Sequence, residues 1–413
     1  MSYLKTLLRE FSIVLISLQV IFCYLLSHFK SLSYKKNNSV FFIGNNYNTF
    51  YNLAESLKKR GWKAISLNPY KDCQFIETYH LFADLSSPKD SIKIFLNIIF
   101  NYKFLHLYNR TTEAIYTGPS RVLKSLLTVK NLKRFGVIVI FTPSGCLDGS
   151  TSKEINEITN GLCEKCIWQG NNRVCNDFKN QEKIDWIRKN CDLFSNEVDL
   201  PKKISQTNIG LNIPIHPLNS EVLMPKLIAP NQHKISKNNN EIIVFTAYGN
   251  QNIRSDDKKD IKGIKYIMSA INKLISEGHP IKHFHATNIP IKNMRYYQVQ
   301  ADIIIDQLNY GSIGSAAREG MMLAKPVICH ISDLIRNTNI AMRDCPAVNA
   351  TENTIYEALK NLVSSKEERL FIGTQSRKWM LKWFDADVCA ERYEKIANRL
   401  INKLPLHPES RFL

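Results

Sequence analysis

The sequence predicts an α/β protein with two Rossmann-like domains that face each other across a cleft. Three observations support this: short apolar runs alternate with helical stretches before residue 213, a polar proline-bearing stretch follows at 213–240, and a second alternating series starts at residue 241. Apolar runs separated by helices form strand–helix–strand units, whose strands pair in parallel. A chain of 413 residues is long enough to build two separate cores.

The first series opens with SVFFIG at 39–44, which predicts a buried strand that ends in a turn. A helix is expected at 47–60 and a second strand at 63–67, with further strands at 104–107 and 136–141. No G-x-G-x-x-G loop follows the first of these runs, which disfavours dinucleotide binding in this domain.

The second series repeats the same alternation. Strands are expected at 241–247, 281–286, 301–307 and 325–331, and helices at 263–274, 314–323 and 366–403. The sequence therefore predicts a membrane-associating N-terminal helix at 1–36 and a first domain at 37–215, which contains a cysteine cluster at 146–175. A linker is expected at 216–240, followed by a second domain with closing helices at 241–403 and a tail at 404–413.

The N-terminal segment combines an apolar run, FSIVLISLQVIFCYLL at 11–26, with basic residues on both sides. This run is shorter than the roughly 20 residues that a comfortable transmembrane helix needs. It predicts either a short signal-anchor or a helix at the inner-membrane surface, and both place the rest of the chain at the cytoplasmic face of the cell membrane. A buried helix packed on the fold is the remaining alternative.

The chain is strongly basic, with a net charge of +18 and a pI of about 9.3. Such a charge favours an anionic partner, for example an anionic lipid or a phosphate-bearing substrate. Nucleic acid is not expected as a partner, because the lysines are spread along the chain and no basic run is interleaved with aromatic residues.

The stretch GSIGSAARE at 311–319 joins an expected strand end to an expected helix start. Gly311 and Gly314 allow the backbone to approach a phosphate closely, and a helix N-terminus favours negative charge. Ser312 and Ser315 can cap the helix or hydrogen-bond an anion. This loop predicts a phosphate-binding site at the carboxyl edge of the second sheet.

Charged residues are expected to gather at the same edge. Lys262 precedes a helix start after the second domain's first strand, and Arg254 lies in the same loop. Glu319 follows the glycine loop on its helix. Because ligands bind at the carboxyl ends of parallel strands, we expect these groups to face one ligand.

The stretches 306–328 and 254–267 resemble the donor-binding segments of family-4-like GT-B glycosyltransferases. The resemblance covers most of residues 241–393 and implies a GT-B fold. It implies a hexosyltransferase that moves a sugar from a nucleotide-sugar donor to a glycan or lipid-linked saccharide acceptor. It further implies retention of anomeric configuration, no catalytic metal, and a role in the synthesis of cell-surface polysaccharide such as capsule or lipopolysaccharide.

By this resemblance, Arg254 and Lys262 hold the diphosphate of the donor and Glu319 holds its ribose. The glycines and serines of the loop complete the donor site. The earlier glutamate of the family's paired-glutamate motif falls on Gly311, so the resemblance leaves open how the transferred sugar is held. Catalysis then rests on positioning and on stabilising the charge of the departing diphosphate.

Two further features concern catalysis. His106 is the one histidine at an expected strand end of the first domain, which makes it the candidate catalytic side chain on the acceptor side, although a lone strand histidine is more often structural. Asp385 and Asp387 have the spacing of a D-x-D metal motif, but they precede an expected helix and are interpreted as a helix cap.

Cysteines are concentrated in the first domain. Cys163 and Cys166 form a C-x-x-C, Cys175 follows, and Cys146 lies upstream. Two thiolates of one turn and two from flanking loops can form a tetrahedral site, with zinc favoured and an iron–sulfur cluster as the alternative. Cys191 is an alternative fourth ligand, and unmetallated thiols are the other interpretation. This stretch also resembles a cysteine-bearing insertion in some polysaccharide-synthesis glycosyltransferases.

Two other functions remain open at this point. Glycine in place of glutamate at 311 is compatible with a catalytically inactive GT-B-like protein that binds nucleotide sugars or acts as a scaffold. The basic charge and the thiols together are compatible with a zinc-stabilised nucleic-acid-binding protein, whose binding would weaken sharply with added salt.

Overall fold

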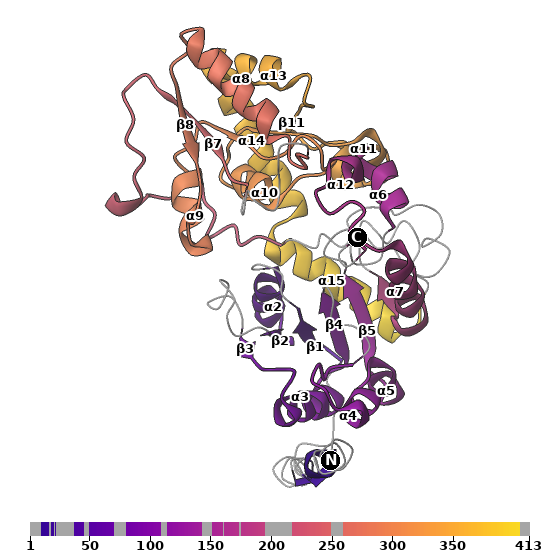
Figure 1. Ribbon diagram of the computed structural model, residues 1–413. Helices are drawn as coiled ribbons and strands as arrows, with labels where there is room; N and C mark the ends of the chain where they lie inside the picture. Colours follow the sequence, from indigo (N-terminus) through magenta and orange to yellow (C-terminus); the bar gives the residue numbers. More distant parts are fainter. Residues whose placement is uncertain are drawn as a thin grey trace.

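The computed structural model describes most of the chain as two lobes (Figure 1). The described residues are 10–15, 18–19, 21, 37–44, 49–69, 80–108, 114–142, 151–159, 161–172, 175–194, 217–248 and 259–404.

The first lobe is built on a parallel sheet with the strand order β3-β2-β1-β4-β5-β6 within the described residues. Its strands are β1 (Ser39–Ile43), β2 (Lys63–Asn68), β3 (Leu81–Phe82), β4 (Phe104–Tyr108), β5 (Ile138–Thr142) and β6 (Leu193–Phe194). Its helices are α2 (Thr49–Lys59), α3 (Pro88–Asn101), α4 (Arg121–Leu126), α5 (Val129–Arg134), α6 (Ser152–Thr159) and α7 (Asp177–Asn190), with the 3-10 turn η2 (Leu162–Lys165).

The second lobe is built on a parallel sheet with the order β11-β10-β9-β7-β8 in the part of the chain that is described. Its strands are β7 (Ile242–Thr246), β8 (Ile281–His285), β9 (Ile303–Ile305), β10 (Val327–Cys329) and β11 (Val348–Asn349). The helices that follow them are α8 (Ile264–Ser276), α9 (Ile291–Gln298), α10 (Ser315–Met322), α11 (Asp333–Thr338), α12 (Ile340–Arg343), α13 (Ile355–Ser364), α14 (Lys366–Trp383) and α15 (Ala386–Ile401).

The central strands explain why the sequence predicted this architecture. Every residue of β1, β4, β9 and β10 is buried, as expected for a parallel sheet covered by helices on both faces. Such strands appear in the sequence as continuous apolar runs rather than as alternating ones. The structure confirms the predicted mixed α/β fold with two parallel sheets.

The two lobes are joined by chain crossings that lie side by side. The linker contains the 3-10 turn η3 (Asn231–His233), and near its start Leu218 donates its backbone N–H to the carbonyl oxygen of Phe384 at 2.8 Å. The backbone N–H of Ala386 donates to the carbonyl oxygen of Leu218 at 3.0 Å. Beyond this point α15 leaves the second lobe and packs against α2 of the first (Figure 1).

The C-terminal helical tail differs from the expectation at 366–403, because it is broken into α14 and α15 at Phe384 and Asp385. The carboxylate of Asp385 accepts the backbone N–H groups of Asp387 and Val388, at 3.0 and 3.4 Å. This bond pattern is that of a helix N-cap, as the sequence indicated for this aspartate.

The N-terminal segment is described only in part, since residues 1–9, 16–17, 20 and 22–36 lie outside the described ranges. Residues 10–15 are helical; Ile13 is buried in the first-lobe core, whereas Phe11 is 63% exposed. Across the described residues, no helix is both long enough and apolar enough to cross a membrane. Part of the predicted apolar run at 11–26 lies outside the described residues.

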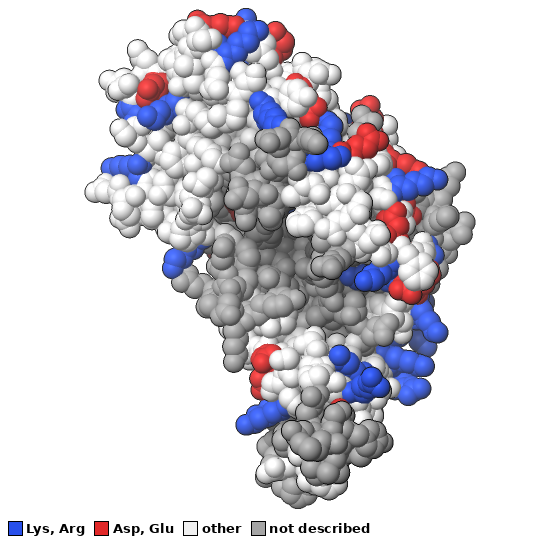
Figure 2. Space-filling view, in the orientation of Figure 1, with Lys and Arg blue, Asp and Glu red and all other residues white. Residues whose placement is uncertain are grey.

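Charge is distributed rather than concentrated. On the face shown in Figure 2, the Lys and Arg side chains of the described residues are spread over both lobes with Asp and Glu among them. The basic residues among those described thus do not form a single patch on this face.

Candidate active site

The glycine loop and Lys262 both lie at the carboxyl edge of the second sheet. The loop follows β9 and leads into α10, and Lys262 lies in the loop between β7 and α8. Since β7 and β9 are paired neighbours, both loops emerge at adjacent strand ends. This is the edge at which parallel α/β sheets bind ligands.

Asp306 links these two loops. It directly follows β9 and is only 1% exposed. Its Oδ1 lies 3.4 Å from Nζ of Lys262. Its Oδ2 accepts the backbone N–H of Gly314 at 2.8 Å. The buried carboxylate of Asp306 thus holds both Lys262 and the N-terminus of α10. These are the two groups that the sequence predicts to bind phosphate.

The glycine at 314 is required by this arrangement. A Cβ atom at Gly314 would lie 2.2 Å from Oδ2 of Asp306, far inside van der Waals contact. Gly314 is also the N-cap of α10, which has no side-chain capping bond. The predicted capping by Ser312 or Ser315 is therefore not observed: Ser315 is the first helical residue, and the Ser312 carbonyl accepts a bond from Gln307 at 2.7 Å.

The backbone conformation at residue 311 favours glycine. Its φ is +68°, in the left-handed region that residues other than glycine rarely adopt. Its carbonyl oxygen accepts the N–H of Ser332 at 2.9 Å, which ties the loop to the start of α11. A glutamate at this position would strain the loop.

Glu319 lies on α10 with its carboxylate among protein atoms. Nε2 of Gln298 donates to its Oε2 at 2.9 Å, and Gln298 itself is fully buried. Burial raises the pKa of Glu319 to about 7; the bond from Gln298 opposes this rise and the charge of Asp306 adds to it. This carboxyl group therefore titrates near neutral pH.

The raised pKa of Glu319 predicts a pH-dependent stability. The unfolded chain releases this proton near pH 4.3, whereas the folded protein keeps it to about pH 7, so folded stability falls as pH rises through this window. Relative to Glu319→Gln, the melting temperature of the wild type should fall between about pH 5 and about pH 8. Glu357→Gln, at an exposed position on α13, is the matched control and should follow the wild type. Parallel melting curves for wild type and Glu319→Gln would contradict the prediction.

Three polar side chains on the paired strands β7 and β8 were not anticipated from the sequence. The hydroxyl of Thr246, at the end of β7, lies 2.9 Å from both Nε2 of His283 and Nδ1 of His285 on β8. Burial lowers the pKa of both imidazoles. The alternation of His283 and His285 within the run IKHFH was the signal that could have identified them.

The structure corrects the prediction for His106, which lies in the middle of β4 rather than at its end. Its ring is 2% exposed and is packed among Phe42, Phe50 and Tyr393. Nε2 lies 2.8 Å from the hydroxyl of Thr142, and burial lowers the pKa of His106 to about 3. The ring therefore lies inside the core in its neutral form, as the structural alternative expects.

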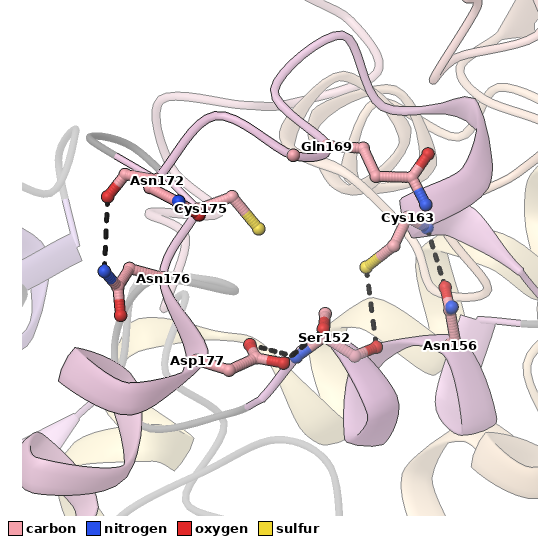
Figure 3. A pocket seen from close by; sticks show the side chains of 9 residues that line it. Ser152, Asn156, Cys163, Gln169, Asn172, Cys175, Asn176 and Asp177 are labelled. Carbon is pink, nitrogen blue, oxygen red and sulfur yellow. Dashed lines mark hydrogen bonds between the residues drawn. The ribbon is translucent and has the colours of Figure 1, made fainter.

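Two of the three described cysteines of the cluster line a polar cavity of about 370 Å³. Cys163 and Cys175 line it and their sulfurs point toward its interior from different segments (Figure 3). Sγ of Cys163 donates to the Ser152 carbonyl at 3.5 Å, and Asp177 accepts the backbone N–H of Ser152 at 2.7 Å. Burial raises the pKa of the Cys175 thiol, and the nearby Asp177 and Cys166 add to the rise.

This geometry does not supply a complete metal site. Among the described residues, no group of three or more histidine, cysteine, aspartate or glutamate side chains could hold a metal ion. Cys191 is buried as the C-cap of α7. The predicted ligand Cys146 and the predicted diphosphate ligand Arg254 both lie outside the described residues.

No protein-family model and no curated protein sequence matches this chain. Solved structures do resemble it. Sucrose-phosphate synthase from Thermosynechococcus elongatus has a TM-score of 0.54 at 11% identity, over 89% of this chain and 100% of that one. A glycosyltransferase from Rickettsia africae has a TM-score of 0.54 at 12% identity, over 89% and 99%. A putative UDP-N-acetylglucosamine 2-epimerase from Listeria monocytogenes has a TM-score of 0.50 at 8% identity, over 89% and 98%.

At these identities the likeness establishes the fold. The chain has the two-domain GT-B fold, with mixed α/β domains on two parallel sheets. The candidate site occupies the carboxyl edge of the second of these sheets.

Proposed function

We propose that this protein is a glycosyltransferase that binds a nucleotide-diphosphate sugar at the carboxyl edge of its second domain. The observation that carries the proposal is the joining of Lys262 and the α10 N-terminus by one buried carboxylate, Asp306, on a GT-B fold. A cation and a helix N-terminus at one sheet edge suit a diphosphate, because both favour negative charge.

Transfer requires stabilisation of the departing nucleoside diphosphate, which gains negative charge as the glycosidic bond breaks. Nζ of Lys262 has three donor hydrogens, and its bond to Asp306 uses one of them. The others are available to phosphate oxygens, and Arg254 would add a second cation. Groups fixed before the reaction stabilise such charge without reorganising. Glu319, on the same helix, is proposed to bind the ribose.

We propose a glycan or lipid-linked saccharide as acceptor, transfer with retention, and a place in cell-surface polysaccharide synthesis at the cytoplasmic face of the membrane. These finer assignments are supported by the sequence resemblance and by the basic flanks of residues 11–26. A direct test is incubation of the full chain with a labelled nucleotide sugar and membrane vesicles, followed by analysis of lipid-linked products.

The first experiment is a thermal-shift screen of the purified protein against UDP-, GDP-, CDP- and dTDP-linked sugars. A ligand at a hundredfold excess over its Kd stabilises the folded state by about 2.7 kcal/mol. A shift with one nucleotide class that is reduced in Arg254→Ala and Glu319→Ala would support the donor site. No shift with any class would refute the proposal, and binding without transfer or donor hydrolysis would favour the inactive nucleotide-sugar-binding alternative.

We also propose that the cysteine segment binds zinc as a structural metal, with an iron–sulfur cluster as the alternative. The C-x-x-C spacing and the shared cavity of Cys163 and Cys175 support this, with Cys146 as the fourth ligand. We expect Cys166→Ser to lose bound metal and to melt at a lower temperature. Cys345→Ala, in the core of the second domain, is the control and should keep its metal. Unchanged melting and metal content in Cys166→Ser would refute the site.

A further inference from the structure

The segment between α6 and α7 makes direct contact with the second domain. Lys165, the last residue of η2, lies with Nζ 2.8 Å from Oε2 of Glu352. The same Nζ donates to Oδ1 of Asn309 at 2.9 Å. The Glu352 side chain is 17% exposed and Asn309 is buried, so this pair is only partly screened by water.

A second lysine makes the reciprocal contact from the other domain. Lys259, at the start of the described part of the loop before α8, donates to the backbone carbonyl of Glu164. It also donates to Oε1 of Gln169 at 3.0 Å. The two domains are therefore held together here by bonds that run in both directions.

These contacts lead to the proposed donor site through buried side chains. Nδ2 of Asn309 donates to Oε1 of Glu352 at 2.8 Å and to the backbone carbonyl of Asp260 at 3.0 Å. The carboxylate of Asp260 in turn accepts the backbone N–H groups of Lys262 and Lys265, at 3.3 and 2.8 Å. Two residues, Asn309 and Asp260, thus separate Lys165 from Lys262.

The contact is independent of the covalent connection between the lobes. The chain crossings at Leu218 and Phe384–Ala386 are formed by other residues, and α6 lies in Figure 1 on the part of the first lobe that reaches toward α11 and α12. The backbone hydrogen bonds at these crossings leave the angle between the two lobes adjustable. An electrostatic contact away from the crossings can fix that angle.

We infer that Lys165 is a positioning residue contributed by the first domain, which holds the Lys262 loop of the second domain in its binding geometry when the two lobes are closed. This inference rests on the proposed function for the identity of the ligand. Donor affinity then depends on lobe closure, because the Lys165 bonds to Asn309 and Glu352 add support to the bonds that run from Asn309 through Asp260 to Lys262.

The test compares Lys165→Met with wild type, with Lys165→Arg, and with the charge exchange Lys165→Glu/Glu352→Lys. Lys153→Met is the matched control, since Lys153 is exposed on α6 in the same segment. Affinities for UDP, GDP, CDP and dTDP are measured by calorimetry, and the radius of gyration by small-angle X-ray scattering. We expect Lys165→Met to bind the preferred nucleotide roughly 5- to 50-fold more weakly and to have a larger radius of gyration.

Lys165→Arg and the charge exchange should restore most of both values, and Lys153→Met should match the wild type. An unchanged radius of gyration in Lys165→Met overturns the inference whatever the affinities are. A larger radius with unchanged affinity also overturns it, because closure would then not position the site. If the wild type binds none of the four nucleotides, the proposed function fails, and the scattering data alone decide whether Lys165 holds the lobes together.

Discussion

Asp306→Ala is expected to lower stability and donor binding together. Removal of one partner of a buried ion pair leaves the other charge uncompensated, and Lys262 is only 13% exposed. The Gly314 N–H loses its acceptor in the same variant. We expect unfolding free energy to fall by about 3 kcal/mol and nucleotide affinity to fall at least tenfold, as measured by denaturant titration and calorimetry.

Two further variants separate the causes. Asp306→Asn keeps an oxygen that can accept the Gly314 N–H but removes the charge beside Lys262, so its stability should lie between those of Asp306→Ala and the wild type. Asp333→Ala, an exposed aspartate at the start of α11, is the control and should change neither value. Wild-type melting of Asp306→Ala would show that the Lys262–Asp306 pair contributes nothing.

Tyr393→Ala is expected to be the most destabilising single change in the contact between α15 and the first domain. Its ring is 1% exposed and lies 5.8 Å from His106, 5.9 Å from Phe42 and 6.0 Å from Trp62, measured between ring centroids. Truncation of a buried aromatic ring leaves a cavity and costs about 3–5 kcal/mol. Denaturant titration should show this loss, because α15 would dock poorly on β1 and α2.

The hydroxyl of the same residue supplies an internal control. Within the described part of the chain, the buried hydroxyl of Tyr393 has no hydrogen-bond partner. Tyr393→Phe keeps the ring and removes this group, so its stability should equal or exceed that of the wild type. Leu370→Ala, at a position 63% exposed on α14, should change little. A loss in Tyr393→Phe as large as that in Tyr393→Ala would show that the hydroxyl, not ring packing, stabilises α15.

Local pattern was sufficient to predict most strands. Residues 39–43 and 303–305 are continuous apolar runs, and a strand buried on both faces requires such a run. The helical tail was predicted as one element because periodicity continues across Phe384, whereas the bonds between Leu218 and the 384–386 turn decide where it breaks.

The candidate site was predicted in part. Lys262 and Gly314 follow strand ends, and that placement is readable from the sequence. His106 was misplaced because a strand's end can be predicted only to within a few residues, and its exposure depends on α15, which returns from the far end of the chain. Asp306 directly follows an apolar run, but its partners Lys262 and Gly314 are 44 and 8 positions away in the sequence. Local pattern therefore does not show that the three residues are joined.

The sequence by itself determined that the chain forms two parallel α/β domains, since period, length and turn residues are local properties of each segment. Only the tertiary structure decided that a carboxylate joins Lys262 to the α10 N-terminus, that the Glu319 pKa is raised, and that Lys165 reaches Asn309 across 144 positions. Burial and charge pairing depend on how separate elements pack against one another, and hydrophobic periodicity fixes only which face of each element is buried.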